Sequence, residues 1–264
     1  MLADVTPLIL TYNEAPNIQR TLGQLSWARE IVVVDSGSTD ETVAILARTP
    51  RVRVIHRQFD SHAKQWNFGL HETGITTAWV LALDADYVLS SELVNEISAL
   101  RPPCDVVAYT TSFRYCVSGK PLRGTAYPAK VTLFRREGAR YEQDGHTQLL
   151  ATQGKVRALR HLIYHDDRKP LHRWVTAQNR YMELEAAKLS ATAAAELSRG
   201  DRLRRCIVLA PPAMFLYCVI VRRNLLDGLP GLYYALQRTC AELLLSLHLL
   251  ELLLGKREHS RTHR

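Results

Sequence analysis

Apolar and polar positions along the first part of the chain predict alternating strands and helices. Four apolar runs are typical of strands buried on both faces: residues 5–10, 31–34, 52–55 and 79–83. Between the first two runs, Ile18, Leu22 and Leu25 recur at helical spacing. A capping box at residues 38–41 starts a second helix, and further helices are predicted over residues 61–71 and 90–100. This order predicts an α/β fold with a mostly parallel sheet flanked by helices.

The second half of the chain has a looser pattern. Residues 105–165 read as further strands separated by loops that contain glycine and proline. A long helix is predicted over residues 170–199, because Pro170 suits a first turn and Gly200 suits a C-terminal cap. We therefore expect a catalytic domain over residues 1–200 and an apolar, basic helical segment over residues 201–264.

Polar residues follow each of the four predicted strands. In a parallel α/β sheet, ligands bind at the carboxyl ends of the strands, which here lead into residues 11–14, 35–40, 60–64 and 84–86. Asp84 and Asp86 are carboxylates one residue apart, and such hard oxygen ligands suit Mg²⁺ or Mn²⁺ shared with a diphosphate. Asp35 follows the second strand and is placed to accept from a base N–H or a ribose hydroxyl, whereas Ser38 and Glu41 are expected to cap the next helix.

Two further segments leave alternatives open. Tyr12, with polar neighbours, either stacks on a nucleoside or lies in a loop that only caps the next helix. The acidic run at residues 165–167 either completes a metal or diphosphate site or caps the helix at Pro170. The cap is the favoured interpretation, because Asp is common before a first turn. Trp174, Tyr181 and Leu184 lie at helical spacing and are expected to form a core stripe.

The motifs LILTYNE, VVVDSGSTDET, HAKQWNFGL and LALDADYVL together resemble glycosyltransferase family 2, whose members have the GT-A fold. The order and spacing match over roughly residues 5–90. A weaker similarity to the lipopolysaccharide-core type of bacterial glycosyltransferase continues through DGHTQLL and YHDDRKPLHRWVTAQNRY. Since Arg180 is not followed by tryptophan, the chain lacks the full QxxRW element of processive synthases, and we infer no processivity.

This resemblance implies roles for particular residues. The nucleotide-sugar site would comprise Thr11, Tyr12 and Glu14 around the nucleoside, Asp35 on the base (usually uracil), Lys64 near the diphosphate, and Asp84 and Asp86 as the DxD element. Asp86 would be the more direct metal ligand, with Asp84 beside it. The family inverts the anomeric carbon, since an acceptor hydroxyl attacks from the face opposite the leaving diphosphate.

The general base is implied to lie in residues 141–148, just before a helix in related proteins. Many relatives have glutamate directly after the histidine of this segment, but this chain has Thr147. Asp144 is therefore the candidate catalytic base, and Glu142 is the second choice.

Charge and hydropathy place the C-terminal segment near an anionic partner. The net charge is +8, and residues 199–264 contribute +6 of it, from eleven Lys or Arg against five Asp or Glu. The same segment is rich in apolar residues but is interrupted by Pro211-Pro212 and by charges, so it suits helices lying in the headgroup region of an anionic membrane. The alternative is helices packed on the catalytic domain or on a partner chain, and nucleic acid is a poor fit to so apolar a segment.

The remaining sequence features bear on where the protein is located in the cell and on which activities are compatible with it. The N-terminus has no basic region or cleavage site of a signal peptide, and five cysteines without a CxxC pair suggest buried thiols. We expect a cytoplasmic enzyme, peripheral on the inner face of the cytoplasmic membrane, that moves a hexose from a nucleotide sugar to a saccharide or lipid-linked glycan acceptor. The rivals are a polyprenyl-phosphate glycosyl transferase and a catalytically silent scaffold, while an NAD-binding oxidoreductase would need the GxGxxG that is missing here.

Overall fold

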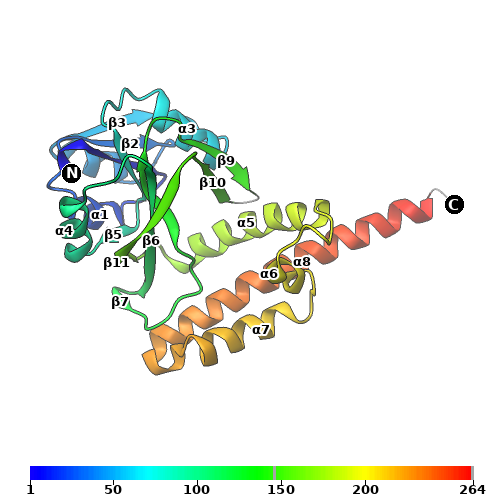
Figure 1. Ribbon diagram of the computed structural model, residues 1–264. Coiled ribbons are helices and arrows are strands. Elements are labelled where there is room, and N and C mark those ends of the chain that lie inside the picture. Colours follow the sequence, from blue (N-terminus) through cyan, green and yellow to red (C-terminus); the bar gives the residue numbers. More distant parts are fainter. Residues whose placement is uncertain (145–146, 263–264) are drawn as a thin grey trace. The chain divides into compact units, whose positions relative to one another are not determined.

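The structure is a computed structural model that describes residues 1–144 and 147–262 (Figure 1). The chain divides into two compact units. The α/β unit comprises Met1–Pro121 and Tyr127–Lys169, and the helical unit comprises Leu122–Ala126 and Pro170–Arg264. The division at Lys169 lies earlier in the chain than the boundary at residue 200 suggested by the sequence, because the long helix after Pro170 packs with the C-terminal helices.

The first half of the α/β unit is a parallel sheet. Its strands lie in the order β3-β2-β1-β4, and they are β1 (Val5–Thr11), β2 (Ile31–Asp35), β3 (Val52–His56) and β4 (Trp79–Asp84). The intervening helices are α1 (Ile18–Gly23), α2 (Thr42–Arg48) and α3 (His62–His71), and a single 3-10 turn, η1 (Leu2–Asp4), precedes β1. These strands match the apolar runs of the sequence, and the predicted α/β fold is confirmed.

The second half of the sheet is mixed. β8 (Lys130–Arg135) lies antiparallel between β4 and β6 (Val106–Val117), and β11 (Lys155–His165) lies parallel to β6. β5 (Tyr87–Leu89) pairs antiparallel with β11, and β7 (Lys120–Pro121) pairs with β6. Helix α4 (Ser91–Ala99) follows β5, while β9 (Arg140–Asp144) and β10 (Thr147–Ala151) form a separate hairpin. The expectation of a mostly parallel sheet therefore holds only for the first half, because β8 returns directly alongside β6.

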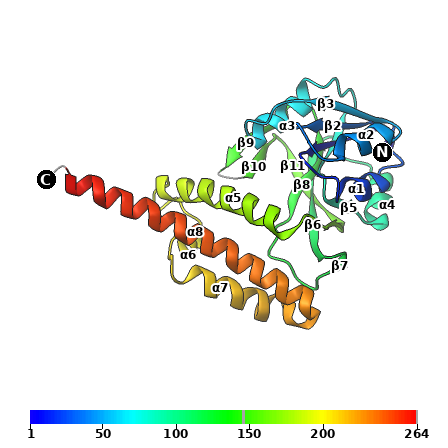
Figure 2. The same cartoon turned by 180° about the vertical axis from the view of Figure 1, so that it is seen from behind.

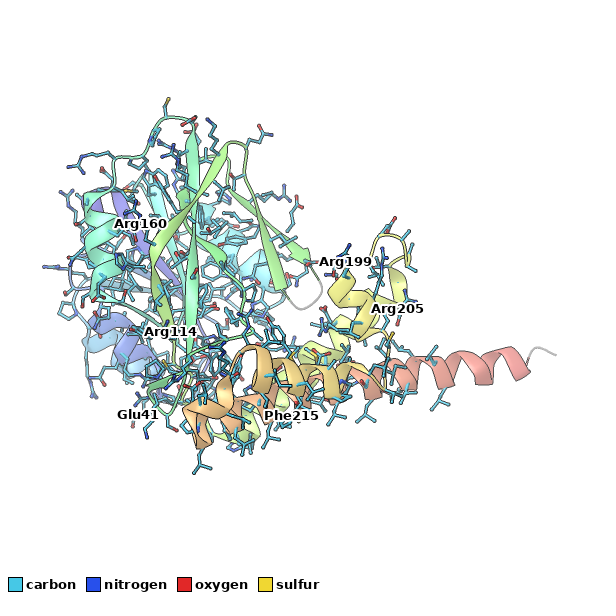
Figure 3. All side chains as sticks on the ribbon, turned by 60° about the horizontal axis from the view of Figure 1, so that its bottom comes forward. Glu41, Arg114, Arg160, Arg199, Arg205 and Phe215 are labelled. Atoms are coloured by element: carbon cyan, nitrogen blue, oxygen red, sulfur yellow. The ribbon has the colours of Figure 1, made fainter. Side chains whose placement is uncertain are left out.

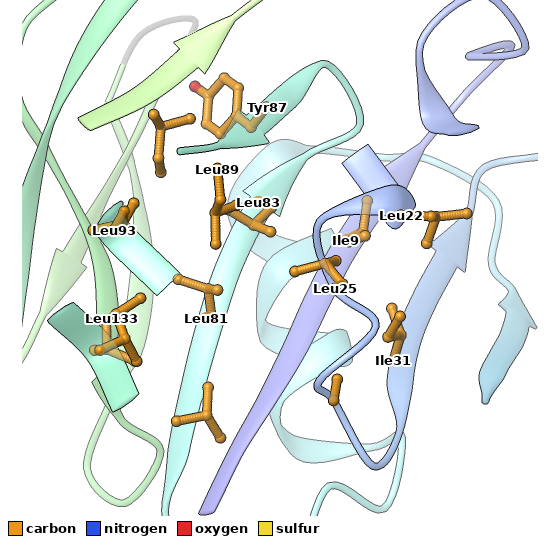
Figure 4. Packing of buried hydrophobic residues seen from close by; sticks show 14 of the residues in the cluster. Ile9, Leu22, Leu25, Ile31, Leu81, Leu83, Tyr87, Leu89, Leu93 and Leu133 are labelled. Carbon is orange, nitrogen blue, oxygen red and sulfur yellow. The ribbon is translucent and has the colours of Figure 1, made fainter. Parts of the chain in front are cut away.

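The core fills both faces of this sheet, which explains why its strands are continuously apolar. On β1, Ile9 packs with Leu81 and Leu83 on the face covered by α1 and α4, as Figure 4 shows. Its neighbour Leu8 faces the other way, toward Trp66 and Leu70 of α3. Successive strand residues point to opposite faces, so a strand covered by helices on both sides needs apolar residues at every position.

Helix caps follow the sequence at two sites and differ at a third. Ser61 accepts from the backbone N of Lys64 at 3.3 Å, and Ser90 accepts from that of Leu93 at 3.1 Å. The expected cap at Ser38 and Glu41 is wrong: α2 begins only at Thr42, and within the described residues its N-cap Glu41 accepts no hydrogen bond from the helix. Ser38 is instead engaged in the loop described below.

The helical unit is built around one long helix. α8 (Leu229–Thr262) packs against α5 (Leu171–Ala191) and α7 (Ala210–Leu216), which lie on either side of it (Figure 2). Between α5 and α8 the chain also forms α6 (Arg199–Arg204), the π-helical turn η2 (Tyr217–Val221) and the 3-10 turn η3 (Asn224–Asp227). Among the residues that the structure describes, no helix has both the length and the apolar character needed to cross a membrane.

Two predictions for the helical unit need correction. The helix expected over residues 170–199 ends at Ala191, and Gly200 lies inside α6 rather than capping α5. Of the expected core stripe, Trp174 is buried and Tyr181 packs, partly buried, against the core of this unit, but Leu184 is exposed. The packed face of α5 instead carries Met182, Ala186 and Leu189. Arg204 joins this face, donating to Glu185 at 2.8 Å and Glu242 at 3.2 Å, so a buried ion network replaces part of the apolar stripe.

Candidate active site

The carboxyl ends of β1, β2 and β4 meet at one edge of the sheet. Thr11 is the register partner of Asp35, and Leu10 is the partner of Asp84. The Thr11 hydroxyl donates to Asp35 Oδ1 at 3.0 Å, and both side chains are buried. The parallel topology thus brings these three predicted site residues to the same edge, as the sequence pattern indicates.

Asp35 is fully buried, and its carboxylate is occupied by its own loop. Oδ1 also accepts from the Ser38 hydroxyl at 2.5 Å, and Oδ2 accepts from the backbone N of Gly37 at 3.0 Å and of Ser38 at 2.9 Å. His56 Nδ1 lies 3.4 Å from Oδ2. Burial alone would raise the pKa of Asp35, but the hydrogen bonds from Ser38, Thr11 and Gly37 outweigh burial and lower it. Asp35 therefore fixes the shape of the loop after β2.

Asp86 has a different environment. It is also buried, yet only Oδ2 is bonded, to His165 Nε2 at 3.1 Å. Among the described residues neither Asp86 Oδ1 nor His165 Nδ1 has a hydrogen-bond partner, although both atoms are buried. Burial would raise the pKa of Asp86, but the charge and hydrogen bond of His165 and the charge of Lys169 outweigh burial and lower it. A buried anionic oxygen without a partner is costly, and such a site is suited to a cation.

Asp84, at the end of β4, is partly exposed and lies near the partly buried Lys130. Lys130 Nζ donates to the Tyr127 hydroxyl at 2.7 Å, and this hydroxyl lies 2.6 Å from that of Tyr87. Burial would lower the pKa of Lys130, but Tyr127 and Asp84 outweigh burial and raise it. The rings of Tyr87, Tyr115 and Tyr127 surround His165, with centroids 5.2, 4.8 and 4.8 Å away.

Glu14 pairs with Lys169, which is the last residue of the α/β unit in the sequence. Its Oε1 lies 2.6 Å from Lys169 Nζ, and its Oε2 accepts from Asn17 at 2.8 Å. Asn17 also donates to Asp167 at 2.9 Å, which ties the loop after β1 to the segment after β11. Burial raises the pKa of Glu14 to about 7, against the opposing charge of Lys169 and with a further increase from Asp86.

The acidic run after β11 belongs to this site and does not cap α5. The N-cap of α5 is Pro170, which makes no side-chain capping bond with the described residues. Asp166 accepts from Arg168 at 2.8 Å and from the backbone N of Gly119 at 3.2 Å, and it pairs with Arg20. The Asp166 backbone N donates to the carbonyl of Asp86 at 3.0 Å. The favoured capping interpretation of residues 165–167 is therefore wrong.

The other predicted site residues lie farther toward solvent. Tyr12 is exposed, and Lys64 on α3 is 71% exposed and lies 3.5 Å from Asp60. Asp144 ends β9 and is partly exposed, and the neighbouring Gln143 accepts from the backbone N of Ala63 on α3 at 3.2 Å. Gly145 and His146 of the predicted base segment, and the side chain of Thr147, lie outside the described residues.

Within residues 1–144 and 147–262, no three His, Cys, Asp or Glu side chains are grouped so as to hold a metal ion by themselves. Sequence reasoning assigned no role to Tyr127 or Lys130. They reach the site because β8 lies beside β4, which no local pattern indicates. The His165 contact also depends on sheet order, since His165 pairs with Tyr87 across β5 and β11.

The chain is similar to several known glycosyltransferases. An uncharacterised glycosyltransferase of Rickettsia bellii is 38% identical over 94 residues, which is 35% of this chain and 31% of the relative. This match thus spans about a third of the relative's length. The lipopolysaccharide core biosynthesis glycosyltransferase LpsC of Rhizobium meliloti is 25% identical over 223 residues, covering 80% of this chain and 79% of LpsC.

Similar solved structures include Staphylococcus aureus TarS 1-349 in complex with UDP-GlcNAc. Its TM-score is 0.46 and its sequence identity is 15%. The superposed region covers 95% of this chain and 92% of TarS 1-349. Glucosyl-3-phosphoglycerate synthase of Mycobacterium tuberculosis has a TM-score of 0.48 and an identity of 13%, covering 72% and 81%. The family model described as Glycosyl transferase family 2 matches residues 8–162, which is more than half of the chain, and the chain belongs to that family.

Proposed function

We propose that the protein is an inverting glycosyltransferase that moves a hexose from a nucleotide sugar, most simply a UDP-sugar, to a saccharide acceptor. The observation that carries this proposal is the unpartnered, buried Oδ1 of Asp86 at the carboxyl edge of the sheet. It lies in the edge where α/β proteins bind nucleotides, beside the loops that contain Thr11, Tyr12 and Glu14.

The residues at this edge fit a divalent cation, Mg²⁺ or Mn²⁺. His165 holds Asp86 through Oδ2 and so leaves Oδ1 for a cation, with Asp84 beside it at the end of β4. A cation bound there, together with diphosphate oxygens of the donor, would neutralise the leaving group. In this arrangement Asp86 is the ligand, and His165 is a positioning residue that orients it.

On the donor side, the contacts give Asp35 and Glu14 distinct roles. Asp35 fixes the loop after β2, so that its Ser36–Asp40 backbone is presented to the nucleoside in one conformation. Exposed Tyr12 is available to stack on the base. Glu14 and Lys169 join the loop after β1 to the end of β11. Lys64, which is exposed on α3, is proposed to contact the diphosphate of the donor.

Asp144 is proposed as the general base. An acceptor hydroxyl would lose its proton to Asp144 as its oxygen attacks the anomeric carbon, while the bond from that carbon to the diphosphate breaks on the opposite face. Asp144→Asn keeps the shape and removes the basicity, so turnover should fall about 10²–10⁴-fold with little change in donor affinity. If Asp144→Asn, Glu142→Gln and Asp166→Asn are all mild, the nucleophile is an ionised phosphate rather than a hydroxyl.

The acceptor is proposed to be a lipid-linked glycan of the bacterial envelope. LpsC, which aligns with 80% of this chain, is named for lipopolysaccharide core biosynthesis. Such an acceptor would place the enzyme on the inner face of the cytoplasmic membrane, as a peripheral protein that also contacts anionic lipid.

The direct test is product analysis. The purified full chain is incubated with a panel of nucleotide sugars and membrane extract, with Mg²⁺ or with EDTA, and products are identified by mass. We expect one donor to give an acceptor heavier by a single hexose, with release of the nucleoside diphosphate and loss of turnover in EDTA. Absence of transfer from every donor would contradict the proposal, and full turnover in EDTA would contradict the metal site.

A further inference from the structure

Exposed apolar side chains are concentrated in the helical unit. Among the described residues, every large hydrophobic side chain that is exposed lies between Leu171 and Leu254, except Tyr12, Leu149 and Val156. Soluble proteins scatter such residues singly, whereas a concentrated set marks an interaction surface. The helical unit therefore carries a surface that is suited to an apolar partner.

One concentrated part of this surface is the turn between α7 and α8, which we call the 220–229 turn. It comprises the end of η2, the whole of η3 and the first residue of α8. Five of its side chains are large, apolar and exposed: Ile220 (65%), Val221 (63%), Leu225 (54%), Leu226 (61%) and Leu229 (80%). Figure 3 shows the side chains that project from α7 and the adjoining part of α8.

This turn is held rigidly by contacts within the helical unit. Asn224 is fully buried and donates to the carbonyl of Gly124 at 2.9 Å. Asp227 accepts from the backbone N of Arg123 at 3.0 Å and lies 3.3 Å from its guanidinium. A Cβ on Gly231 would lie 1.8 Å from the Asn224 carbonyl oxygen, so the first turn of α8 closes directly onto η3. With Asn224 and Asp227 engaged by Gly124 and Arg123, the leucines of this turn remain exposed.

The charges of the turn are basic. Arg222 and Arg223 are both exposed and lie between the two groups of apolar residues. Asp227, the single acid in the sequence of residues 220–229, is engaged by Arg123. Arg222 lies over the Tyr217 ring at 5.0 Å, which directs its aliphatic stem along an aromatic side chain. Two guanidinium groups thus lie between the exposed apolar residues of the turn.

We propose that the 220–229 turn inserts into the surface of an anionic phospholipid bilayer. Leucine and isoleucine side chains would enter the acyl boundary, while Arg222 and Arg223 would meet lipid phosphates. A helix groove on a protein recognises apolar residues along one continuous helix. The apolar residues of this turn instead come from three separate segments, η2, η3 and α8, which a fluid surface can accommodate. The inference rests on the proposed function only in that a lipid-linked acceptor gives membrane docking a purpose.

The test is co-sedimentation of the purified full chain with phosphatidylcholine vesicles, made with or without phosphatidylglycerol. Donor and acceptor are left out, so the result does not depend on the proposed activity. The variant is Leu225→Glu with Leu226→Glu. The matched control is Leu171→Glu with Leu184→Glu, two exposed leucines of α5 in the same unit. A second variant, Arg222→Gln with Arg223→Gln, removes the two charges and keeps the exposed apolar residues.

We expect the unaltered chain to bind phosphatidylglycerol vesicles about thirtyfold more strongly than neutral ones, as two arginines at an anionic surface predict. The turn variant should lose about tenfold or more of this binding, and the α5 control should stay within about threefold. The arginine variant should lose the preference for anionic lipid. Because the substituted residues are exposed, all variants should keep the circular dichroism spectrum of the unaltered chain.

Three results would overturn the inference. One is failure of the unaltered chain to bind phosphatidylglycerol vesicles, and another is equal binding by the turn variant. The third is a dimer of the unaltered chain in analytical ultracentrifugation that dissociates in the turn variant, which would show that a second copy covers the turn. If the unaltered chain binds these vesicles but transfers no hexose from any donor, that result would instead contradict the proposed function alone.

Discussion

Asp35 and Asp86 follow strands on opposite sides of β1, both are buried, and both carry a lowered pKa. They differ in how their oxygens are used. Both oxygens of Asp35 accept hydrogen bonds from neighbouring groups in β1 and its own loop, whereas Asp86 leaves Oδ1 without a partner among the described residues. The protein itself therefore satisfies both oxygens of Asp35, whereas Oδ1 of Asp86 is left to bind a ligand.

This difference separates structural from binding roles at one sheet edge. A position after a buried strand places a carboxylate at the ligand edge in both cases. The hydrogen bonds around it then decide whether it holds a loop or holds a ligand. The two aspartates should accordingly respond to substitution in different measurements, one in activity and the other in stability.

The largest expected effect is that of Asp86→Asn on turnover. The variant removes the anionic oxygen proposed for the cation while keeping the side-chain shape, so kcat should fall about 10³-fold, which corresponds to about 4 kcal/mol. The free energy of unfolding should fall modestly, since the anionic carboxylate loses its favourable interactions with His165 and Lys169. Steady-state kinetics and urea unfolding measure the two quantities.

A matched control for this prediction is Asp105→Asn, an exposed carboxylate that pairs with Lys155 at 2.7 Å. It should leave kcat unchanged. Turnover of Asp86→Asn within a few-fold of the unaltered chain would mean that Oδ1 binds no ligand in the reaction.

Asp35→Asn should act mainly on stability. Replacing a carboxylate oxygen by an NH₂ group removes charge-assisted bonds to Gly37, Ser38 and Thr11, which should lower the free energy of unfolding by about 2–3 kcal/mol. If Asp35 also contacts the base, UDP affinity falls beyond the loss caused by instability. Calorimetry with UDP at a temperature well below unfolding distinguishes the two contributions.

The pH dependence of stability gives an independent check on Asp35. Its pKa is lower in the folded protein than the ordinary carboxyl value of about 3.9. Its contribution is therefore fully present above that ordinary value and is lost as the pH falls through the lower, folded pKa. Urea unfolding across the acid range should show a smaller loss of stability in Asp35→Asn than in the unaltered chain. Identical acid limbs would contradict the role of Asp35 in the loop.

A smaller effect is expected for His165→Gln. Glutamine can still donate to Asp86 Oδ2 but does not reproduce the ring held among Tyr87, Tyr115 and Tyr127. The Mg²⁺ concentration for half-maximal turnover should rise about 10–100-fold, as for other residues that orient a metal ligand. Saturating Mg²⁺ should restore most of kcat, and a permanent loss of kcat would instead place His165 in contact with the reacting groups.

The sequence predicted the first half of this site well and the second half poorly. Thr11, Asp35 and Asp84 could be placed because parallel strands end at one edge, and their apolar runs are unambiguous. The contact of His165 with Asp86 could not be placed, since the run at residues 165–167 before Pro170 carries the same local signal for a helix cap and for a ligand site. Lys130 and Tyr127 had no signal, because the insertion of β8 between β4 and β6 is a property of the whole sheet.

Lys64 should give the smallest effect. Its side chain is 71% exposed and lies 3.5 Å from Asp60, so Lys64→Ala should change the free energy of unfolding by less than about 0.5 kcal/mol. An exposed ammonium near a diphosphate contributes about 1 kcal/mol at most, so KM for the donor should rise about two- to fivefold, and less at high salt. The matched control is Lys155→Ala, which is 70% exposed and pairs with Asp105 at the amino end of β11, away from the ligand edge. Equal KM values for the two variants would show that Lys64 does not contact the donor. The diphosphate would then be bound through Asp86, Asp84 and the cation that they are proposed to hold.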